Sequence, residues 1–391
     1  MIDLKDLRAR PDTYRKGAVD KNYDCDIDHL LAADAALRAA LTEHQELLAQ
    51  KNRISKLMGQ KIGQAKQLDG KLKKARDQGL DPASAEHKDL VNQVDEVQVL
   101  ASGFQKEAEQ LKSHESDLDA RVKELTAIRD KHWLTVPQPA DPDVPVGKSA
   151  DDNVPLRTWH PAEGFDPRKT FEDNKGFAPK THMELGQTLG LFDFERGVKM
   201  AGSRSYLLTG DGMRLHNAVL QFAFNYMTGT HGFKAMSVPV MVREELMVGT
   251  GFFPGGRDQA YHIEETKRGG GHDMFLTGTG EVGLMGVHQG EILDEEDLPK
   301  CYTTVSTCFR REAGSGGKDT AGLYRIHQFD KVEQVVVCKA DEEESRNWHT
   351  KMLGYVEEIL KQLELPYRLL QCCTGDLGMK NADMIDVECW M

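Results

Sequence analysis

The sequence predicts an α+β protein in which a long antiparallel pair of N-terminal helices precedes a mostly antiparallel sheet flanked by helices. Residues 28–132 contain one proline, Pro82, and abundant Leu, Ala, Lys, Gln and Glu, which is the composition of long helices. Residues 133–155 then contain five prolines, and the rest of the chain is richer in Gly, aromatic and β-branched residues. A length of 391 residues suits two or three domains.

Apolar residues recur at alternating spacings of three and four along both halves of the helical stretch. In the first half, seven of nine such positions from Leu47 to Ala75 are apolar. In the second half, nine of ten are apolar, and the ten positions are Val94, Val97, Ala101, Phe104, Ala108, Leu111, Glu115, Leu118, Val122 and Leu125. The segment from Gly79 to Pro82 carries turn signals. The pattern therefore predicts a helical hairpin whose second helix covers about residues 84–131.

The first helix of this hairpin is strongly basic near the predicted turn. Nine basic residues and one acidic residue lie between Lys51 and Arg76, although the whole chain has a net charge of −13. Such a run is either the solvated face of a coiled coil or a strip that follows nucleic-acid phosphates. Because arginines are few and aromatic residues absent there, a strip that binds nucleic acid would recognise the shape of the nucleic acid and not its base sequence.

Beyond the proline-rich segment, short strand-like runs alternate with helical ones. The expected strands are 236–242, 302–308 and 331–338, and the expected helices are 212–228 and 341–364. No repeated βαβ spacing is present, so an antiparallel sheet is favoured over a doubly wound one. We therefore expect a helical arm over residues 1–132, a linker over 133–155 and a core over 156–391.

Composition excludes several classes of protein. No run of 18 apolar residues is present, and the charged N-terminus has no apolar signal core. Seven cysteines without disulfide-like spacing suit a reducing cytoplasm. Cys372, Cys373 and Cys389 have poor spacing for zinc, so we expect no metal ligands within the chain.

The stretch TCFRREAGSGGKDTAGLYRIHQFDKVE, residues 307–333, predicts two strands joined by a Gly-rich loop. In a regular strand, alternate side chains share a face. The first strand would then carry Arg310 and Glu312 on one face, and the second would carry Arg325, His327, Phe329, Lys331 and Glu333 on one face. A packed core does not accept these charges unpaired. The stretch is therefore either a surface ion-pair network or a polar floor that offers arginines to anions, a ring for stacking and carboxylates to amines.

A second candidate is LTGTGEV, residues 276–282. In an extended strand Thr277, Thr279 and Glu281 share one face, and the glycines between them permit close approach of a ligand. A hydroxyl beside a carboxylate can hold a small ammonium group, while an ordinary strand end is the alternative.

Together these segments resemble bacterial seryl-tRNA synthetases, which are class II aminoacyl-tRNA synthetases, over essentially the whole chain. The hairpin matches the tRNA-binding arm of that family, CFRREAGSGGKDTAGLYRIHQFDKVE resembles motif 2, and FLTGTGEV resembles the Thr-x-Glu serine loop. HGFKAMSVPVMV resembles motif 1 with its proline, Pro239, and GDLGMKNADMIDVECWM resembles the run into motif 3.

The resemblance implies a serine site and an ATP site. Thr279 and Glu281 would bind the α-amino group of serine, with Gly280 between them, and Glu333 would bind its hydroxyl. The implied ATP contacts are Arg310 on the α-phosphate, Arg311 beside it, Glu312 on the adenine amino group, Arg325 on the γ-phosphate and Phe329 stacked on adenine. Arg310 and Arg325 would be the catalytic residues, with Mg²⁺ accompanying ATP.

The family also implies a homodimer that charges tRNA(Ser), with tRNA(Sec) as a further candidate. Six basic residues of the hairpin would then contact tRNA: Arg53, Lys56, Lys66, Lys71, Lys73 and Lys74. Two departures bear on this interpretation. Gly280 stands where the family has a small residue such as Ser or Ala, which predicts a looser loop. The sequence also ends at Met391, before the motif 3 segment of the family.

The second departure leaves alternatives open. The chain could be an inactive fragment, or a synthetase-like RNA-binding protein without catalysis. A ligase that loads an amino acid onto a carrier protein is a third alternative, and the long hairpin counts against it.

Overall fold

The computed structural model describes residues 2–162, 164–166, 168–314 and 322–390. The chain forms two compact units. The helical unit comprises Ile2–Ala18 and Tyr23–Val136, and the sheet unit comprises Val19–Asn22 and Pro137–Met391.

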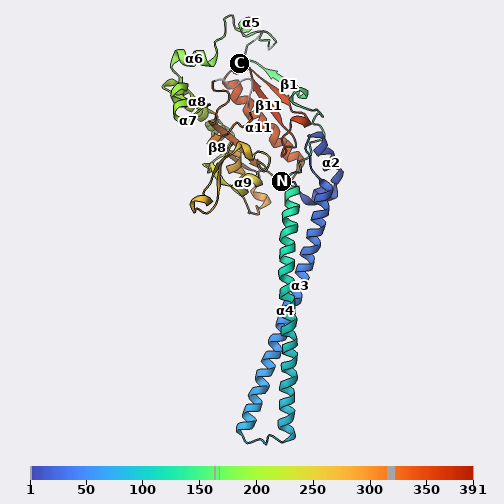
Figure 1. Ribbon diagram of the computed structural model, residues 1–391. Helices are drawn as coiled ribbons and strands as arrows, with labels where there is room; N and C mark the ends of the chain where they lie inside the picture. Colours follow the sequence, from blue (N-terminus) through green and yellow to red (C-terminus); the bar gives the residue numbers. More distant parts are fainter. Residues whose placement is uncertain (1, 163, 167, 315–321, 391) are drawn as a thin grey trace. The chain divides into compact units, whose positions relative to one another are not determined.

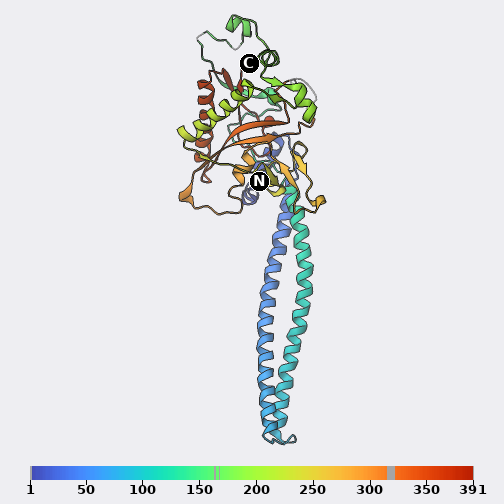
Figure 2. The same cartoon turned by 90° about the vertical axis from the view of Figure 1, so that its left-hand side faces the viewer.

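Two long antiparallel helices, α3 (Ile27–Asp77) and α4 (Ala85–Trp133), dominate the helical unit and lie side by side along their length (Figures 1 and 2). At 1.5 Å per residue, the 51 residues of α3 span about 77 Å. Asp26 and Ser84 cap the two helices, each accepting a hydrogen bond from a backbone N–H three residues on. The hairpin predicted from the sequence is confirmed.

The apolar stripes predicted for the two helices are the surfaces that meet. Leu47, Ile54, Ala65 and Leu72 of α3 are buried, as are Val94 and Leu118 of α4. Of the three polar positions in the stripes, Lys51 and Glu115 form an ion pair with each other, and Lys61 donates to the side chain of Gln64 at 3.0 Å. Lys51 and Glu115 are therefore compatible with packing of the two helices, because each compensates the charge of the other.

Two short helices at the N-terminus, α1 (Leu4–Ala9) and α2 (Pro11–Asp20), have no counterpart among the sequence predictions. They contribute to an apolar cluster at the base of the hairpin, which consists of Ile2, Leu7, Tyr14, Ile27, Leu30 and Val136. Trp133 donates its indole N–H to the carbonyl of Ile2 at 3.0 Å.

The sheet unit is built around two ten-residue antiparallel strands, β8 (Lys300–Phe309) and β9 (Gln328–Val337), seen in orange in Figure 2. The short strand β4 (Lys234–Ala235) pairs with β8 in parallel. Three further antiparallel groups complete the unit: β1 (Val154–Trp159), β10 (Tyr367–Gln371) and β11 (Ile385–Cys389); β5 (Met241–Arg243), β7 (Met274–Leu276) and β6 (Tyr261–Ile263); and β2 (Phe192–Asp193) with β3 (Leu207–Leu208).

Helices surround these strands. They are α5 (Phe171–Lys175), α6 (His182–Leu189), α7 (Phe194–Ala201), α8 (Asp211–Asn225), α9 (Glu244–Gly249), α10 (Glu281–Gly286) and α11 (Glu342–Gln362). Helix α8 packs against β8 and β9. No helix of the described residues has the length and apolar character that crossing a bilayer requires.

Among the three strands at 236–242, 302–308 and 331–338 and the two helices expected in this unit, one strand prediction is wrong. Strands 302–308 and 331–338 fall almost wholly within β8 and β9, and the two predicted helices correspond to α8 and α11. The predicted strand at 236–242 is wrong for most of its length, because only Met241 and Val242 belong to β5. Pro239, which has no N–H to donate, lies in the irregular segment before it.

Candidate active site

One face of the β8–β9 pair carries most of the predicted site. Because side chains alternate along a strand, the cross-strand pairs on this face are Cys308 with Phe329, Ser306 with Lys331 and Thr304 with Glu333. Thr304 and Cys308 are fully buried. The prediction that Phe329, Lys331 and Glu333 share a face is therefore confirmed.

Lys331 lies at the centre of a closed hydrogen-bond network on this face. Its Nζ is 2.7 Å from Oγ1 of Thr279 and 2.5 Å from Oε2 of Glu333. The Thr279 hydroxyl in turn donates to the same Oε2 at 2.6 Å, and Thr279 is only 4% exposed. The ammonium compensates the partly buried carboxylate, so the three groups hold one another in place.

The loop that carries Thr279 is not the extended strand that its alternation predicts. Strand β7 ends at Leu276, and α10 begins at Glu281. The loop is fixed at Thr277, whose N–H donates to the carbonyl of Val240 and whose own carbonyl accepts from Phe309. Glu281 therefore starts a helix, and its Oε1 lies 2.6 Å from Nζ of Lys380. Lys380 had no sequence signal, because 99 positions separate it from Glu281.

Gly280 tightens the loop, contrary to the expectation from the sequence. A Cβ atom at this position would lie 2.7 Å from Cγ2 of Thr304 and 2.8 Å from Oγ of Ser306. Both neighbours are short side chains on buried strand positions and have little room to move. Glycine is required here because the loop packs directly on β8.

We therefore expect Gly280→Ala to lower the free energy of unfolding by about 1–3 kcal/mol, the usual cost of overpacking a filled site. Urea denaturation followed by circular dichroism measures the difference. Gly271→Ala is the matched control, since a Cβ there meets nothing within 4 Å. Equal stabilities for the two variants would contradict the close packing of Gly280.

The predicted phosphate-binding arginines lie just beyond the end of β8. Arg310 donates from Nε to the carbonyl of Gly278 at 3.3 Å, and its guanidinium lies 5.2 Å from the centre of the Phe329 ring. Its own carbonyl lies 2.9 Å from Nδ1 of His327. Arg311 instead donates to the carbonyl of Asp258 at 3.1 Å.

Glu312 and Arg325 form an ion pair at 3.1 Å. Neither residue belongs to a strand, so the expectation that strand alternation places them on one face is wrong, as it is for Arg310 and His327. Glu312 instead has a φ of +52°, and Arg204 donates to its carbonyl at 3.1 Å. The turn still brings Glu312 and Arg325 together, although the Gly-rich loop between them lies partly outside the described residues.

Arg310, Glu312 and Arg325 line a cavity of about 370 Å³. The apolar side chains of Met247, Phe252 and Phe309 line the same cavity. A cavity of this size, with two guanidinium groups and one carboxylate, can hold an anionic ligand that also has an apolar ring.

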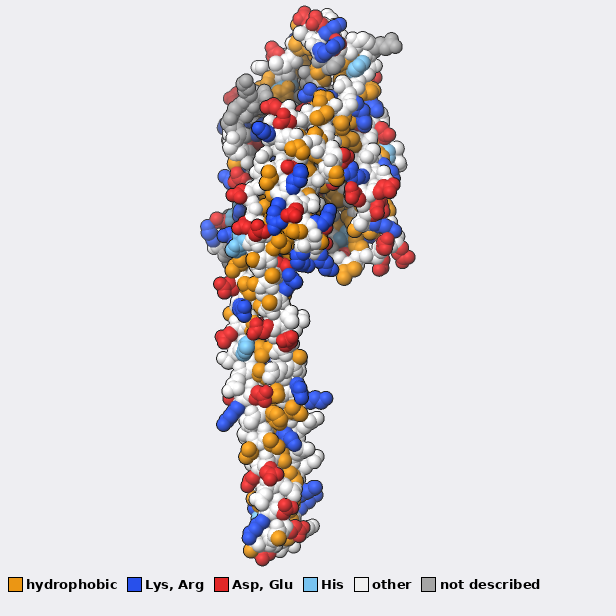
Figure 3. All heavy atoms as spheres, turned by 90° about the vertical axis from the view of Figure 1, so that its right-hand side faces the viewer, with side chains coloured by type: hydrophobic (Ala, Val, Ile, Leu, Met, Phe, Trp, Pro, Cys, Tyr) orange, Lys and Arg blue, Asp and Glu red, His pale blue; other side chains and the backbone are white. Residues whose placement is uncertain are grey.

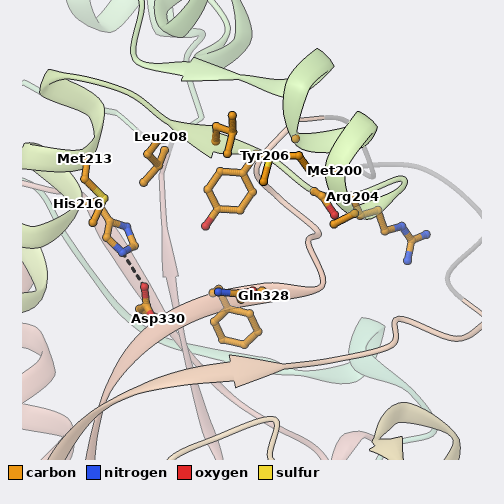
Figure 4. Close-up of a pocket in the computed structure, with 13 residues that line it drawn as sticks. Met200, Arg204, Tyr206, Leu208, Met213, His216, Gln328 and Asp330 are labelled. Atoms are coloured by element: carbon orange, nitrogen blue, oxygen red, sulfur yellow. Dashed lines mark hydrogen bonds and ion pairs between the residues drawn. The ribbon is translucent and has the colours of Figure 1, made fainter.

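A second cavity, of about 380 Å³, is lined by residues of α7, α8 and β9, and Phe329 lines this cavity and not the first (Figure 4). His216 of α8 points towards Asp330, and their side chains meet at 3.0 Å. Thr307 donates to the other oxygen of Asp330 at 2.6 Å. Burial and the charge of Asp330 raise the pKa of Tyr206, which lines the same cavity. No sequence pattern predicts a role for these residues, since their pairing depends on how α8 packs.

Among the described residues, no group of three or more carboxylates lies together where it could hold Mg²⁺. The three candidate carboxylates are each paired with a basic side chain: Glu281 with Lys380, Glu312 with Arg325 and Glu333 with Lys331. The single group of possible metal ligands in the described part of the chain is Cys372, Asp376 and Asp386. Burial raises the pKa of the Cys372 thiol to about 12, and Mg²⁺ prefers oxygen ligands.

Most side chains of the basic strip predicted on the hairpin are exposed, while Lys51 and Lys61 are partly buried. Arg53, Lys56, Lys66, Lys71, Lys73 and Lys74 are all exposed, and none forms an ion pair with another described residue. Lys and Arg side chains project along the hairpin in Figure 3. The basic residues at the two ends of the strip differ from these six because they have side-chain partners: Lys51 pairs with Glu115, and Arg76 donates to His87 at 3.0 Å.

Comparisons with known proteins agree with this combination of hairpin and site. The family profile for the seryl-tRNA synthetase N-terminal domain matches residues 1–102, and that for the class II tRNA synthetase core domain (G, H, P, S and T) matches residues 261–391. The chain is 36% identical to a serine--tRNA ligase of Deinococcus radiodurans, covering 100% of this chain and 80% of that protein. A serine--tRNA ligase of Rhodococcus jostii is 38% identical, with coverages of 100% and 81%.

Solved structures give the same result. A seryl-tRNA synthetase from Pyrococcus horikoshii, crystallised with ATP, superposes with a TM-score of 0.74 at 32% identity, covering 100% of this chain and 81% of that one. Hairpin, strand topology and sequence similarity thus agree along the whole chain. The chain belongs to the seryl-tRNA synthetase family of class II aminoacyl-tRNA synthetases.

Proposed function

We propose that this chain attaches serine to tRNA(Ser) through a seryl-adenylate. The observation that carries the proposal is the network of Thr279, Lys331 and Glu333 on the same strand pair that leads into Arg310. Groups that can hydrogen-bond to a small polar amino acid thereby lie next to the Arg310 guanidinium, which can bind a phosphate. The proposed organisation follows the sequence: residues 1–132 bind tRNA, residues 133–155 connect, and residues 156–391 carry the chemistry.

In the proposed serine site, Thr279 and Glu281 bind the α-ammonium group and Glu333 accepts the side-chain hydroxyl. Gly280 supports this arrangement, because the absence of a side chain lets the loop lie against β8. Alanine has no hydroxyl to donate, so the accepting capacity of Glu333 that Lys331 and Thr279 do not use stays unsatisfied in a partly buried site. Such a site discriminates against the analogue without the hydroxyl by about 10⁴-fold.

In the proposed ATP site, Arg310 binds the α-phosphate and Arg325 the γ-phosphate, with Arg311 beside them. Phe329 stacks on adenine, and Glu312 accepts from the adenine amino group. An oxygen of the serine carboxylate attacks the α-phosphorus, the bond to the bridging oxygen breaks, and pyrophosphate leaves. The terminal hydroxyl of tRNA then attacks the acyl carbon, and AMP leaves. No protein nucleophile takes part, so catalysis depends on positioning and charge compensation.

We include Mg²⁺ in the proposal as a companion of ATP, bound to its phosphates. Glu281, Glu312 and Glu333 are each paired with a basic side chain, and we assign neither a ligand within this chain nor a reaction step to the ion.

The proposal includes a homodimer. Large apolar side chains exposed on α6, α7 and α8 support the dimer, because the surface of a monomeric protein seldom exposes so many of them together. These side chains are Leu185, Leu189, Val198, Met200, Met213, Leu215 and Val219. It also includes tRNA(Sec) as a second tRNA substrate, because a strip that reads shape does not depend on particular bases. The expected compartment is the cytoplasm.

Serine-dependent exchange between ATP and pyrophosphate tests the proposal. We expect exchange with serine, exchange about 10⁴-fold weaker with alanine, and charging of total tRNA with serine. Exchange that responds to alanine or glycine instead of serine would contradict the proposed specificity. Absence of exchange with every amino acid, together with binding of tRNA, would favour a non-catalytic RNA-binding protein. Exchange without tRNA charging would favour a carrier-protein ligase.

A further inference from the structure

Lys380 brings a second ammonium group to the proposed serine site. It lies in the segment between the short helical turn Thr374–Asp376 and β11. Its Nζ is 2.6 Å from Oε1 of Glu281 and 3.8 Å from the centre of the Phe252 ring. The stem of the side chain passes Gly251, where a Cβ would lie 3.3 Å from Cβ of Lys380. A carboxylate and an aromatic face thus hold the ammonium group on two sides.

The chemistry that holds this lysine is the chemistry that an amino-acid ammonium requires. Both groups are compact cations with three N–H donors, and both bind best to a carboxylate oxygen. The Glu281 carboxylate is 30% exposed and the Lys380 side chain 29% exposed, so a ligand can reach either. Two ammonium groups therefore compete for one carboxylate.

We propose that Lys380 is an internal competitor for the ammonium group of the amino acid and thereby raises the KM for serine. The inference rests on the proposed function, since it requires Glu281 to receive the serine ammonium. Binding of serine then displaces Nζ of Lys380 from Oε1 of Glu281. The apparent affinity for serine is reduced by the fraction of molecules in which Lys380 occupies the carboxylate.

A positioning role for Lys380 makes the opposite prediction, and the surroundings of Glu281 argue against it. The backbone N–H of Glu281 donates to Oγ1 of Thr279 at 3.3 Å, and Gly280 is packed on β8. The start of α10 is therefore fixed without Lys380. Lys331 differs in this respect, because it contacts both Thr279 and Glu333 and closes the network between them.

The test compares Lys380→Met with Lys380→Arg and the unsubstituted chain. For Lys380→Met we expect the KM for serine in pyrophosphate exchange, and the Kd for serine from titration calorimetry, to fall about fivefold. We expect kcat and the KM for ATP to stay within about twofold, because Lys380 leaves the carboxylate before the reaction. Lys380→Arg keeps the cation and should keep the high KM. Lys339→Met is the matched control, as Lys339 is an exposed lysine paired with Glu295.

An unchanged or higher KM for serine in Lys380→Met would overturn the inference, as would a low KM in Lys380→Arg. These outcomes are distinct from failure of the proposed function. If the unsubstituted chain shows neither exchange with serine nor binding of serine, the proposed function fails. If it shows both and Lys380→Met matches it, only the inference about Lys380 fails.

Discussion

Replacing Arg310 with Ala is expected to reduce kcat for serine-dependent pyrophosphate exchange by about 10³-fold, the usual loss when a preorganised donor to a developing charge is removed. In the proposed reaction, negative charge increases on the oxygens of the α-phosphate as the carboxylate attacks. Arg310 supplies a permanently charged planar group at the cavity that holds Glu312 and Arg325. Its Nε bond to the Gly278 carbonyl fixes the stem, which leaves the terminal nitrogens available to ATP.

The contacts of Arg310 also define its controls. Arg310→Lys keeps the charge but loses the two-pronged geometry, so we expect an intermediate loss of about 10²-fold. Arg168→Ala is the matched control, because Arg168 is an exposed arginine paired with Asp166. A loss below tenfold in Arg310→Ala would exclude its proposed place on the α-phosphate. A change in the KM for ATP alone would indicate that Arg310 binds ATP equally in ground and transition states.

The parts of the fold that the sequence predicts are those governed by local periodicity. The hairpin follows from one repeated spacing, and two of its three polar exceptions, Lys51 and Glu115, pair with each other. Phe329, Lys331 and Glu333 share a face because a long regular strand alternates strictly. The short helices α1 and α2 escape prediction, since six and ten residues are too few to establish a helical period.

The remaining parts of the site depend on where the strands stop, which alternation does not reveal. Arg310 and Glu312 lie just past β8, and the positive φ of Glu312 changes the direction of the chain there. Glu281 starts a helix because the loop before it is bonded to two other segments. Similarly, Lys380 reaches Glu281 only through tertiary packing.

Replacing Lys66, Lys71, Lys73 and Lys74 together with Ala is expected to lower kcat/KM for tRNA by about 10²- to 10³-fold while leaving pyrophosphate exchange unchanged. These four side chains are exposed near the end of α3 and form no ion pair with other described residues. Their charge is therefore available to release counterions from tRNA phosphates. None of the four contributes to the buried stripe, so the hairpin should remain folded.

Salt dependence separates this electrostatic role from a general loss of binding. Each lysine that neutralises a phosphate contributes about 0.9 to the slope of log K against log salt, so four should reduce its magnitude by about 3.6 if their partners are duplex phosphates. Substituting four basic residues elsewhere on the hairpin, Lys106, Lys112, Arg121 and Lys123, controls for net charge. Those residues lie on α4 among acidic neighbours, where local attraction for phosphate is weaker. An equal loss in both variants would mean that net charge, and not the strip on α3, governs tRNA binding. Loss of pyrophosphate exchange in the α3 variant would mean that these lysines act on the catalytic reaction as well.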